Sequence, residues 1–406
     1  MSSISKKVVV GLSAVVFAYV ATGYLRARGS DDKAYHALTV YSEVLDKIQR
    51  EYVDDPNMHA VTNGALHGLL DSLDPASSYL SPLEYKDYKE KSERKAGGAA
   101  GLSLTKRFGY ISVISALPDS PAQKAGLRLG DIIEKISGFT TAQMSVDQAQ
   151  VLLNGDPGST VKLSVIRRGK QEPQEMDLTL AKLPEPKLYT EKLPGDIAYL
   201  RVSEFTPGVT KDIREKLVQF SHEGAHKLVL DLRESSLGDI QEGISTAQLF
   251  LSSGTITTLK GQTVSPIVSA ADPSKVAWTD PVAVLIGNGT AGPAEIAAAA
   301  IGDNHAGDTV GDRTYGTASQ QKWIELEDGS ALILTVANYY TPSGKEIPVD
   351  GVSPTVLIQP APADSVAQLD ENYSPSLSTS VSPDDVVVRK AIEVLQGNGT
   401  TLKKAA

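Results

Sequence analysis

The chain has 406 residues, of which 41% are hydrophobic and 22% are charged, a composition typical of a folded protein with two or three domains. Its net charge of −10 disfavours nonspecific binding to nucleic acid, which requires a basic surface. No cysteine is present, so disulfides, thiolate catalysis and cysteine-bound metals are excluded.

An uncharged apolar run, residues 8–25, lies near the N-terminus between two lysines and two arginines. A run of this length can just cross a bilayer, and its basic start is also typical of a signal peptide. No small-residue cleavage pattern ends the run, which favours an uncleaved anchor. We therefore expect residues 1–30 to be a signal anchor or signal peptide. The remainder is then exported, to the periplasm or another extracytoplasmic space, and held at the inner membrane by residues 8–25.

Two regions of different character follow. Residues 31–95 show helical periodicity, with Ser81 as a candidate N-cap and Pro82 at a first helical position. Residues 96–182 are predicted to form a small β-rich domain, because apolar alternation over YISVISAL and STVKLSVIRRG indicates strands. Ser145 is a candidate cap for the one longer helix of this domain.

Strands and helices alternate from residue 185 to residue 359, which predicts an α/β layered core. Residues 360–381 are rich in proline, serine and alanine and are predicted to be a flexible linker. Residues 382–397 are predicted to form a C-terminal helix, capped by Ser382 with Pro383 at its first position. The fold class is therefore α/β multidomain, with an N-terminal helical segment, a β-rich domain and the layered core.

Two short motifs match known signatures but lack the context that those signatures need. Gly287–Gly292 reads G-x-G-x-x-G after an apolar strand, as in dinucleotide-binding loops, yet few further strands follow it. His222–His226 reads H-E-x-x-H, but Gly224 interrupts the helix that would align the two histidines. We therefore expect no metal and no cofactor, and keep dinucleotide binding through Gly287–Gly292 as a distant alternative.

Several longer stretches, in order, carry a more specific signal: SPAQKAGLRLGDIIEKISG, then LVLDLRESSLGDIQEGISTAQLFL, VGDRTYGTASQQ and DGSALILTVANYYTPSGKEI. Together they resemble the carboxy-terminal (tail-specific) processing serine peptidases. The first stretch resembles the core of the PDZ domains that these enzymes carry, and the other three resemble successive blocks of their catalytic domain. The resemblance covers nearly the whole chain and implies a PDZ domain over residues 96–182 and a peptidase-like core over residues 185–359.

Members of this family use a serine nucleophile, a lysine base and an assisting glutamine, since a serine hydroxyl needs a neighbouring base to become nucleophilic. By resemblance, the nucleophile position is Gly292 and the base position is Thr317, while Gln321 matches the glutamine. Pro293, next to the nucleophile position, has no N–H for an oxyanion, and Leu237 replaces a glycine in the other oxyanion block.

These differences lead us to expect a pseudoprotease that regulates or scaffolds proteolysis, with an active homologous protease as one partner. The alternative is an active serine endopeptidase cleaving near protein C-termini through a non-standard site. Candidate replacement groups for such a site are Thr290, Ser319 and Lys322.

The PDZ-like domain is expected to bind peptide or protein C-termini by adding the peptide to a sheet edge. Ala100 and Gly101 match the carboxylate loop, and the apolar pocket would be lined by Leu102, Leu104, Val151 and Leu152. These leucines have an alternative role as simple core residues. Similar proteins use N-terminal helices for dimer contacts, so the resemblance also implies a homo-oligomer.

Overall fold

The computed structural model describes residues 35–94, 96–167, 170, 172–186, 188–358, 381–382 and 384–397. The expected anchor, residues 8–25, lies outside these residues, as does nearly all of the expected linker. Within the described ranges, no helix is both long enough and apolar enough to cross a bilayer. The chain divides after Leu66 into two compact units.

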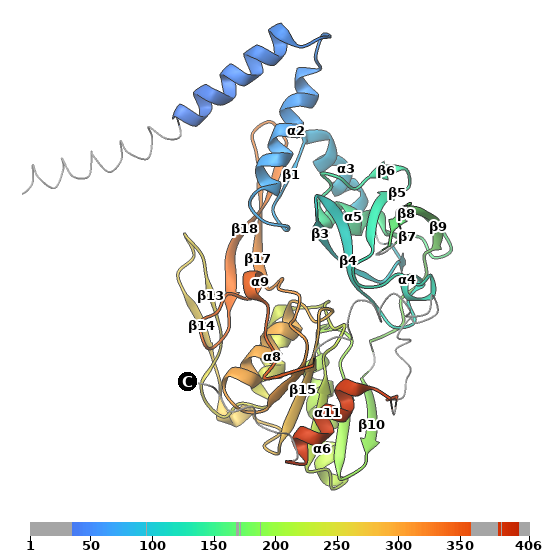
Figure 1. Ribbon diagram of the computed structural model, residues 1–406, viewed down its shortest axis with the longest axis vertical. Coiled ribbons are helices and arrows are strands. Elements are labelled where there is room, and N and C mark those ends of the chain that lie inside the picture. The colour runs from blue at the N-terminus through green and yellow to red at the C-terminus, as the bar shows by residue number, and fades with distance from the viewer. Residues whose placement is uncertain are drawn as a thin grey trace, which may run out of the picture. The chain divides into compact units, whose positions relative to one another are not determined.

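The first unit is helical (Figure 1). Residues 35–51 form one helix, and α2 (Met58–Asp71) begins in this unit and ends in the next. Apolar side chains of the first helix are largely exposed, including Leu38 at 62% and Val44 at 50%. This helix therefore gains little stability from burial within the described chain.

The second unit opens with α3 (Pro82–Ser92), whose start follows the expected pattern. Ser81 caps the helix in a capping box with Glu84, and Pro82 occupies its first turn. The β-rich domain comes next, with one sheet in the order β3-β4-β5-β8-β9 and all pairs antiparallel. Its strands are β3 (Leu102–Arg107), β4 (Tyr110–Ala116), β5 (Ile132–Ile136), β8 (Thr160–Ile166) and β9 (Gln174–Thr179).

Smaller elements complete this domain. β6 (Phe139–Thr140) pairs with β5, and β2 (Gly98–Ala99) pairs with β7 (Asn154–Gly155). Its helices are α4 (Pro121–Lys124) and α5 (Val146–Leu152). Ser145 caps α5 in a capping box with Gln148, as the sequence predicts.

The layered core is built on a six-stranded sheet in the order β10-β11-β12-β15-β16-β19. Only the edge strand β10 is antiparallel to its neighbour. The strands are β10 (Tyr189–Leu193), β11 (Ile197–Arg201), β12 (Lys227–Asp231), β15 (Val282–Ile286), β16 (Asp308–Gly311) and β19 (Val356–Leu357). β15 is buried along its whole length, as expected for a central parallel strand covered on both faces.

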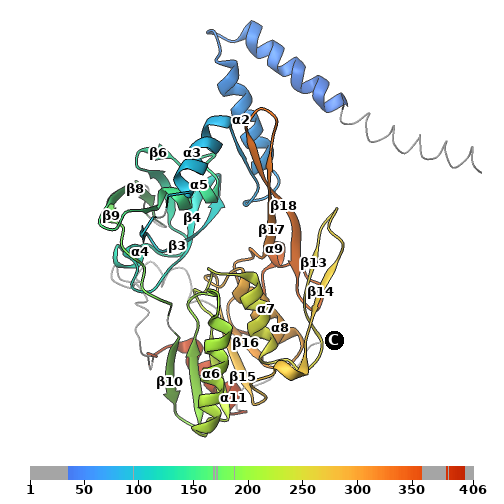
Figure 2. The same cartoon turned by 180° about the vertical axis from the view of Figure 1, so that it is seen from behind.

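Alternate residues of this sheet pack into two separate hydrophobic cores, one on each face. One face packs with α6 (Val209–His222) and α8 (Pro293–Asp303), and the other packs with α11 (Val386–Leu395). Figure 1 shows α11 in front of the sheet, and the reverse view in Figure 2 shows α6 in front. The C-terminal helix is therefore an integral layer of the core.

A second sheet, which the sequence analysis did not predict, packs beside α7 (Ile240–Gln248) and α8. It has the order β1-β18-β13-β14, with β17 also paired to β18. Its strands are β1 (Ser78–Leu80), β13 (Thr255–Lys260), β14 (Ile267–Ala270), β17 (Ser319–Glu325) and β18 (Ala331–Tyr340). β1 comes from the region predicted to be wholly helical, and its three residues are buried. The short helices η1 (Pro273–Lys275) and α9 (Ile347–Asp350) lie in connections of the core.

The start of the C-terminal helix differs from the prediction. The helix begins at Val386 and is capped by Asp385, which accepts hydrogen bonds from the backbone N–H groups of Val387 and Val388. Ser382 was expected to be the cap. The aspartate prevails because its carboxylate satisfies two of the unpaired N–H groups of the first turn.

Candidate functional site

The turn between β15 and α8 has the backbone shape of a nucleophile-bearing turn. Gly292 has φ 55° and ψ −116°, and the helix begins at the next residue, Pro293. A sharp strand-to-helix turn of this kind presents its central side chain above the sheet in hydrolases. A Cβ added at Gly292 would meet only the Thr317 Oγ1, at 3.9 Å. The turn is therefore retained with room for a side chain that the residue lacks.

A buried carboxylate ties this turn to the segment that carries Thr317. Glu295 is 0% exposed, and its Oε2 accepts hydrogen bonds from the Gly292 N–H at 2.8 Å and the Thr317 N–H at 2.9 Å. Its Oε1 accepts from the Gly316 N–H at 2.6 Å and the Thr314 hydroxyl at 2.5 Å. Burial raises the pKa of Glu295, while these donors lower it.

Glu295 is a site residue that was not predicted from the sequence. A signal was present, because a glutamate three residues after a turn residue is the usual partner in a helix N-terminal cap. The four bonds fix the separation between Gly292 and Thr317. The Gly292 N–H also donates to the Thr317 Oγ1 at 3.0 Å, so the positions that resemble the family's nucleophile and base lie side by side.

Thr290, the first candidate replacement nucleophile, is buried with 0% exposure. Its hydroxyl donates to the Leu232 carbonyl at 2.9 Å and accepts from the Gly287 N–H at 3.1 Å. The first bond joins the turn to the segment that follows β12, and the second closes the turn on itself. The residue therefore stabilises the turn and does not face a substrate.

The other candidates lie on β17, on two different faces. Ser319 and Gln321 line a large cavity, and the Gln321 Nε2 donates to the Ser319 Oγ at 2.7 Å. Lys322 is exposed and is not among the residues that line the cavity, as expected because neighbouring side chains of a strand point to opposite faces. The fold thus brings Thr317, Ser319 and Gln321 to one wall and leaves Lys322 apart from them.

By resemblance, residues 231–238 should supply the other oxyanion donor, and this segment lies beside the nucleophile turn. The Ala291 N–H donates to the Ser235 carbonyl at 2.9 Å, which joins the two segments. Leu237 is half-buried, and its carbonyl accepts from the Phe205 N–H at 2.8 Å. Gly238 has φ 123°, and a Cβ there would overlap the Phe205 carbonyl, so this position requires glycine.

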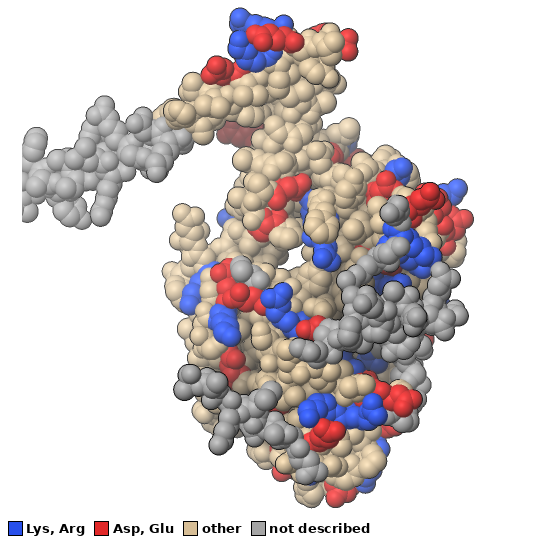
Figure 3. Space-filling view, in the orientation of Figure 1, with Lys and Arg blue, Asp and Glu red and all other residues tan. Residues whose placement is uncertain are grey.

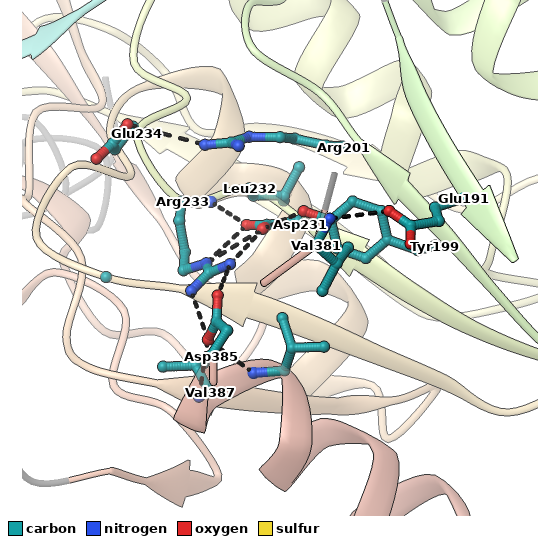
Figure 4. Close-up of polar contacts among 12 residues, drawn as sticks. Glu191, Tyr199, Arg201, Asp231, Leu232, Arg233, Glu234, Val381, Asp385 and Val387 are labelled. Atoms are coloured by element: carbon teal, nitrogen blue, oxygen red, sulfur yellow. Dashed lines mark hydrogen bonds and ion pairs between the residues drawn. The ribbon is translucent and has the colours of Figure 1, made fainter. Parts of the chain in front are cut away.

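A charged network anchors the start of this block (Figure 4). The Arg233 Nη2 lies 2.7 Å from the Asp231 Oδ2 and 2.8 Å from the Asp385 Oδ2. The Tyr199 hydroxyl donates to the Asp231 Oδ2 at 2.6 Å. Burial alone would raise the pKa of Asp231, but the Arg233 guanidinium and the Tyr199 hydroxyl hold it at about 2. The C-terminal helix therefore reaches the oxyanion block through Asp385, a link that the sequence did not reveal.

A cavity of about 1570 Å³ is lined by residues of both the peptidase-like core and the β-rich domain. The peptidase-like core contributes the 313–317 segment together with Ser319, Gln321 and Trp323. The β-rich domain contributes residues 104–107 of β3, the following Phe108, and the start of α5. A peptide held at β3 would therefore enter the space that contains Thr317 and Ser319.

The expected peptide-binding residues fall into two groups. Ala100, Leu102 and Leu104 are buried in the core of the β-rich domain, and Leu104 also lines the cavity. Gly101 has φ 77°, and a side chain there would collide with Ser120. Val151 and Leu152 are half-buried on α5. The leucines thus support the domain from within, and β3 has a free edge because β4 is its one pairing partner among the described strands.

Neither short motif, His222–His226 or Gly287–Gly292, forms the site that its signature indicates. Helix α6 ends at His222, so His222 and His226 do not share a helix face. In the G-x-G-x-x-G loop, the Gly287, Ala291 and Gly292 N–H groups already donate within the protein, and Glu295 places a carboxylate at the helix N-terminus. The Glu295 carboxylate disfavours a pyrophosphate at this helix N-terminus, which argues against the dinucleotide alternative.

Comparisons with known proteins agree with this architecture. A profile of peptidase family S41 matches residues 196–358, and a PDZ-domain profile matches residues 112–167. The carboxy-terminal-processing protease of Bartonella bacilliformis is 31% identical over 343 residues, which cover 82% of this chain and 78% of that protein. The carboxyl-terminal-processing protease of Synechocystis sp. is 29% identical over 367 residues, covering 88% and 83%.

A solved structure supports the same fold. The photosystem II D1 C-terminal processing protease superimposes with a TM-score of 0.64 at 26% identity, over 79% of this chain and 92% of that one. The β-rich domain and the layered core are thus a PDZ domain and a peptidase core, as the resemblance implies.

These findings correct one expectation. The relatives are named as proteases, so the interpretation as a pseudoprotease that only regulates or scaffolds proteolysis is wrong, and the findings favour the alternative of an active endopeptidase. The departures at Gly292, Pro293 and Thr317 are facts of the sequence, and their consequence for the chemistry stays a prediction.

The family itself is settled by how far the similarity extends. Identity of 31% runs through most of both chains, and the PDZ domain precedes the peptidase core in sequence. The chain belongs to the carboxy-terminal-processing proteases of peptidase family S41.

Proposed function

We propose that this chain is an endopeptidase that cleaves proteins near their C-termini through a site that differs from the family's serine and lysine. The observation that carries the proposal is the shared cavity of about 1570 Å³, because it joins the edge of the PDZ domain to the hydroxyl groups beside the nucleophile turn. Binding of a protein tail and attack on its backbone can then take place in one space.

Two hydroxyl groups in this cavity are candidates for the attacking group. The Thr317 Oγ1 accepts from the Gly292 N–H, which leaves its own proton free for transfer. The Ser319 Oγ accepts from the Gln321 Nε2 at 2.7 Å and donates to the Thr317 carbonyl at 3.2 Å. Thr290 and Lys322 are not part of the proposal, because one is buried and the other lies outside the cavity lining.

The proposed reaction is acyl transfer. The hydroxyl oxygen forms a bond to the carbonyl carbon of the substrate, the peptide C–N bond breaks, and the hydroxyl proton leaves on the departing amine. Water then hydrolyses the ester and restores the hydroxyl. Glu295 keeps Thr317 beside the turn during both steps, as a positioning residue.

Alanine substitutions test this proposal. Thr317→Ala and Ser319→Ala are compared with Ser252→Ala, a change at an exposed serine elsewhere in the core. We expect turnover of an unfolded substrate with an apolar tail to fall at least ~100-fold in one of the first two variants, as for loss of a nucleophile. Mass spectrometry should place the cut near the substrate C-terminus. Equal turnover in all three variants would refute the assignment.

We also propose that the protein is exported and held at the inner membrane by residues 8–25. The uncharged run between basic flanks supports this location. Retention in the membrane fraction after an alkaline wash, lost when residues 1–30 are deleted, is the expected result. Release of the full chain by the same wash would contradict anchoring.

We further propose self-association through the helix over residues 35–51. Its exposed apolar side chains, including Leu38, Tyr41 and Val44, are typical of surfaces that pack against another chain. Sedimentation should show a larger species for the exported chain than for a variant that lacks this helix. Equal monomer masses would contradict the proposal.

A further inference from the structure

We propose that the preferred substrates are protein tails with an apolar C-terminus and an acidic residue several positions upstream, which Arg107 and Arg313 recognise. This inference rests on the proposed function, because it names the substrate class of the same cavity. It goes further by assigning two residues that the family's chemistry does not identify.

The free edge of β3 determines where each residue of a bound tail would lie. In PDZ domains the terminal carboxylate is caught in a backbone loop and the peptide extends the sheet. The corresponding loop, at Gly101, comes directly before β3, and β4 occupies the other edge of the strand. The last residue of the tail would thus lie near Leu102, and the residue opposite Arg107 would lie about five positions upstream, since paired strands advance in step.

The far end of β3 faces the segment that carries Thr317. Burial raises the pKa of Tyr315, while the Arg107 guanidinium and the Thr105 side chain lower it, so these groups are neighbours across the cavity. Arg313 lines the same cavity two residues before Tyr315. A tail that leaves β3 toward Thr317 must therefore pass both arginines.

Arg107 and Arg313 differ from the other two basic residues of the lining. Lys106 pairs with Asp71, and the Arg167 Nε lies 3.8 Å from the Asp131 Oδ2. Arg107 lies over the Phe108 ring, 5.2 Å from its centroid, and both Arg107 and Arg313 are exposed. Within the part of the chain that the structure describes, neither has a carboxylate partner.

Three acidic residues also line the cavity. Asp74 accepts from the Ser77 hydroxyl and the Thr335 hydroxyl, and Glu346 accepts from the Asn338 side chain. Burial raises the pKa of Asp147. The lining thus carries four basic and three acidic residues, and Arg107 and Arg313 are its basic side chains that lack a carboxylate partner among the described residues.

The excess of basic residues in the lining is opposite in sign to the charge of the whole molecule. The net charge is −10, and the face drawn in Figure 3 carries acidic and basic side chains scattered over it. The net charge of the molecule repels an acidic segment, whereas the guanidinium groups of Arg107 and Arg313 attract it. Charge complementarity of this kind contributes more to the specificity of binding than to its affinity.

Peptide binding, measured by fluorescence anisotropy, tests the inference without requiring cleavage. The probes are peptides that end in apolar residues and carry either glutamate or glutamine about five residues before the C-terminus, the position that pairs with the end of β3. We expect the glutamate peptide to bind about 3- to 10-fold more tightly, with a preference that weakens as salt rises. Arg107→Gln combined with Arg313→Gln should abolish this preference. The control is Arg389→Gln, an exposed arginine on α11, which should keep it.

Charge reversal provides a second measurement. Arg107→Glu with Arg313→Glu should bind a lysine-bearing peptide more tightly than the glutamate peptide. Equal binding of glutamate and glutamine peptides to the unaltered chain, or a preference that survives both arginine changes, would overturn the inference. A chain that shows the preference but cuts nothing would refute only the proposed function, so the two failures are distinguishable.

Discussion

Replacing Asp385 tests whether the C-terminal helix is a working part of the peptidase core. The Asp385 carboxylate makes two kinds of contact. It binds the Arg233 guanidinium through Nη1 at 3.2 Å and Nη2 at 2.8 Å, and it caps α11 by accepting from two backbone N–H groups. Asparagine retains one oxygen for the cap but loses the charge. Alanine loses both contacts.

The two substitutions should differ by the value of the cap. A hydrogen bond to a charged group contributes about 1.5–3 kcal/mol. Since Arg233 keeps Asp231 as a partner, we expect Asp385→Asn to lower the free energy of unfolding by about 1–2 kcal/mol, the lower part of that range. Removing an N-cap costs a further ~1 kcal/mol, so Asp385→Ala should lower it by about 2–3 kcal/mol.

Urea unfolding followed by tryptophan fluorescence can measure these differences. The chain has two tryptophans, and Trp278 is 2% exposed in the core that contains α6 and α8. In a Trp323→Phe background the signal comes from this core alone. The matched control is Asp384→Asn, which changes an exposed neighbouring aspartate and should shift stability by less than ~0.5 kcal/mol. If Asp385→Asn and Asp384→Asn unfold alike, the Arg233 contact does not stabilise the core.

Three further predictions concern the same region. Gly238→Ala should lower the free energy of unfolding by about 3 kcal/mol or more, because its φ of 123° is strained and its Cβ would overlap a backbone carbonyl; Gly224→Ala, with open space, should cost about 1 kcal/mol. The pKa of Asp231 is about 2 in the folded state against 3.8 ordinarily, so its stabilising contribution is present above about pH 4 and is lost as the pH falls toward 2. The stability gap to Asp231→Asn, followed by urea unfolding, should shrink over that interval, and a constant gap would contradict the assignment. Gly292→Ser should fold at a cost of about 1–2 kcal/mol from its positive φ, measured by thermal unfolding, and failure to fold would show that the turn has no room.

The sequence predicted the elements that local rules determine. Ser81 and Ser145 are caps as expected, because each is followed three residues later by a Glu or Gln that completes a capping box. The apolar run at Val282–Ile286 is a central strand, since parallel strands covered on both faces are apolar throughout. The strand β1 was missed because its pairing with β18 joins residues more than 250 positions apart, beyond the reach of any local pattern.

The location of the candidate site could be predicted from the sequence, but the side chains that form it could not. Resemblance brought Gly292, Thr317 and Gln321 to attention, and the fold places the first two in contact. In the sequence, Thr290 and Ser319 are equivalent candidates because both carry a hydroxyl group. In the structure, Thr290 is buried and only Ser319 lines the cavity. The contact of Asp385 with Arg233 spans 152 residues and depends on how α11 packs, so no spacing in the sequence could indicate it.

Cleavage by the unaltered chain, compared with the double variant Thr317→Ala, Ser319→Ala, tests the central claim most directly. We expect an unfolded protein with an acidic segment and an apolar tail to be cut near its C-terminus, and the double variant to lose at least ~100-fold of this turnover. Binding of an apolar-tailed peptide should be retained in the variant, because neither hydroxyl lies on β3. Absence of turnover in the unaltered chain, or equal turnover in both, would contradict the claim.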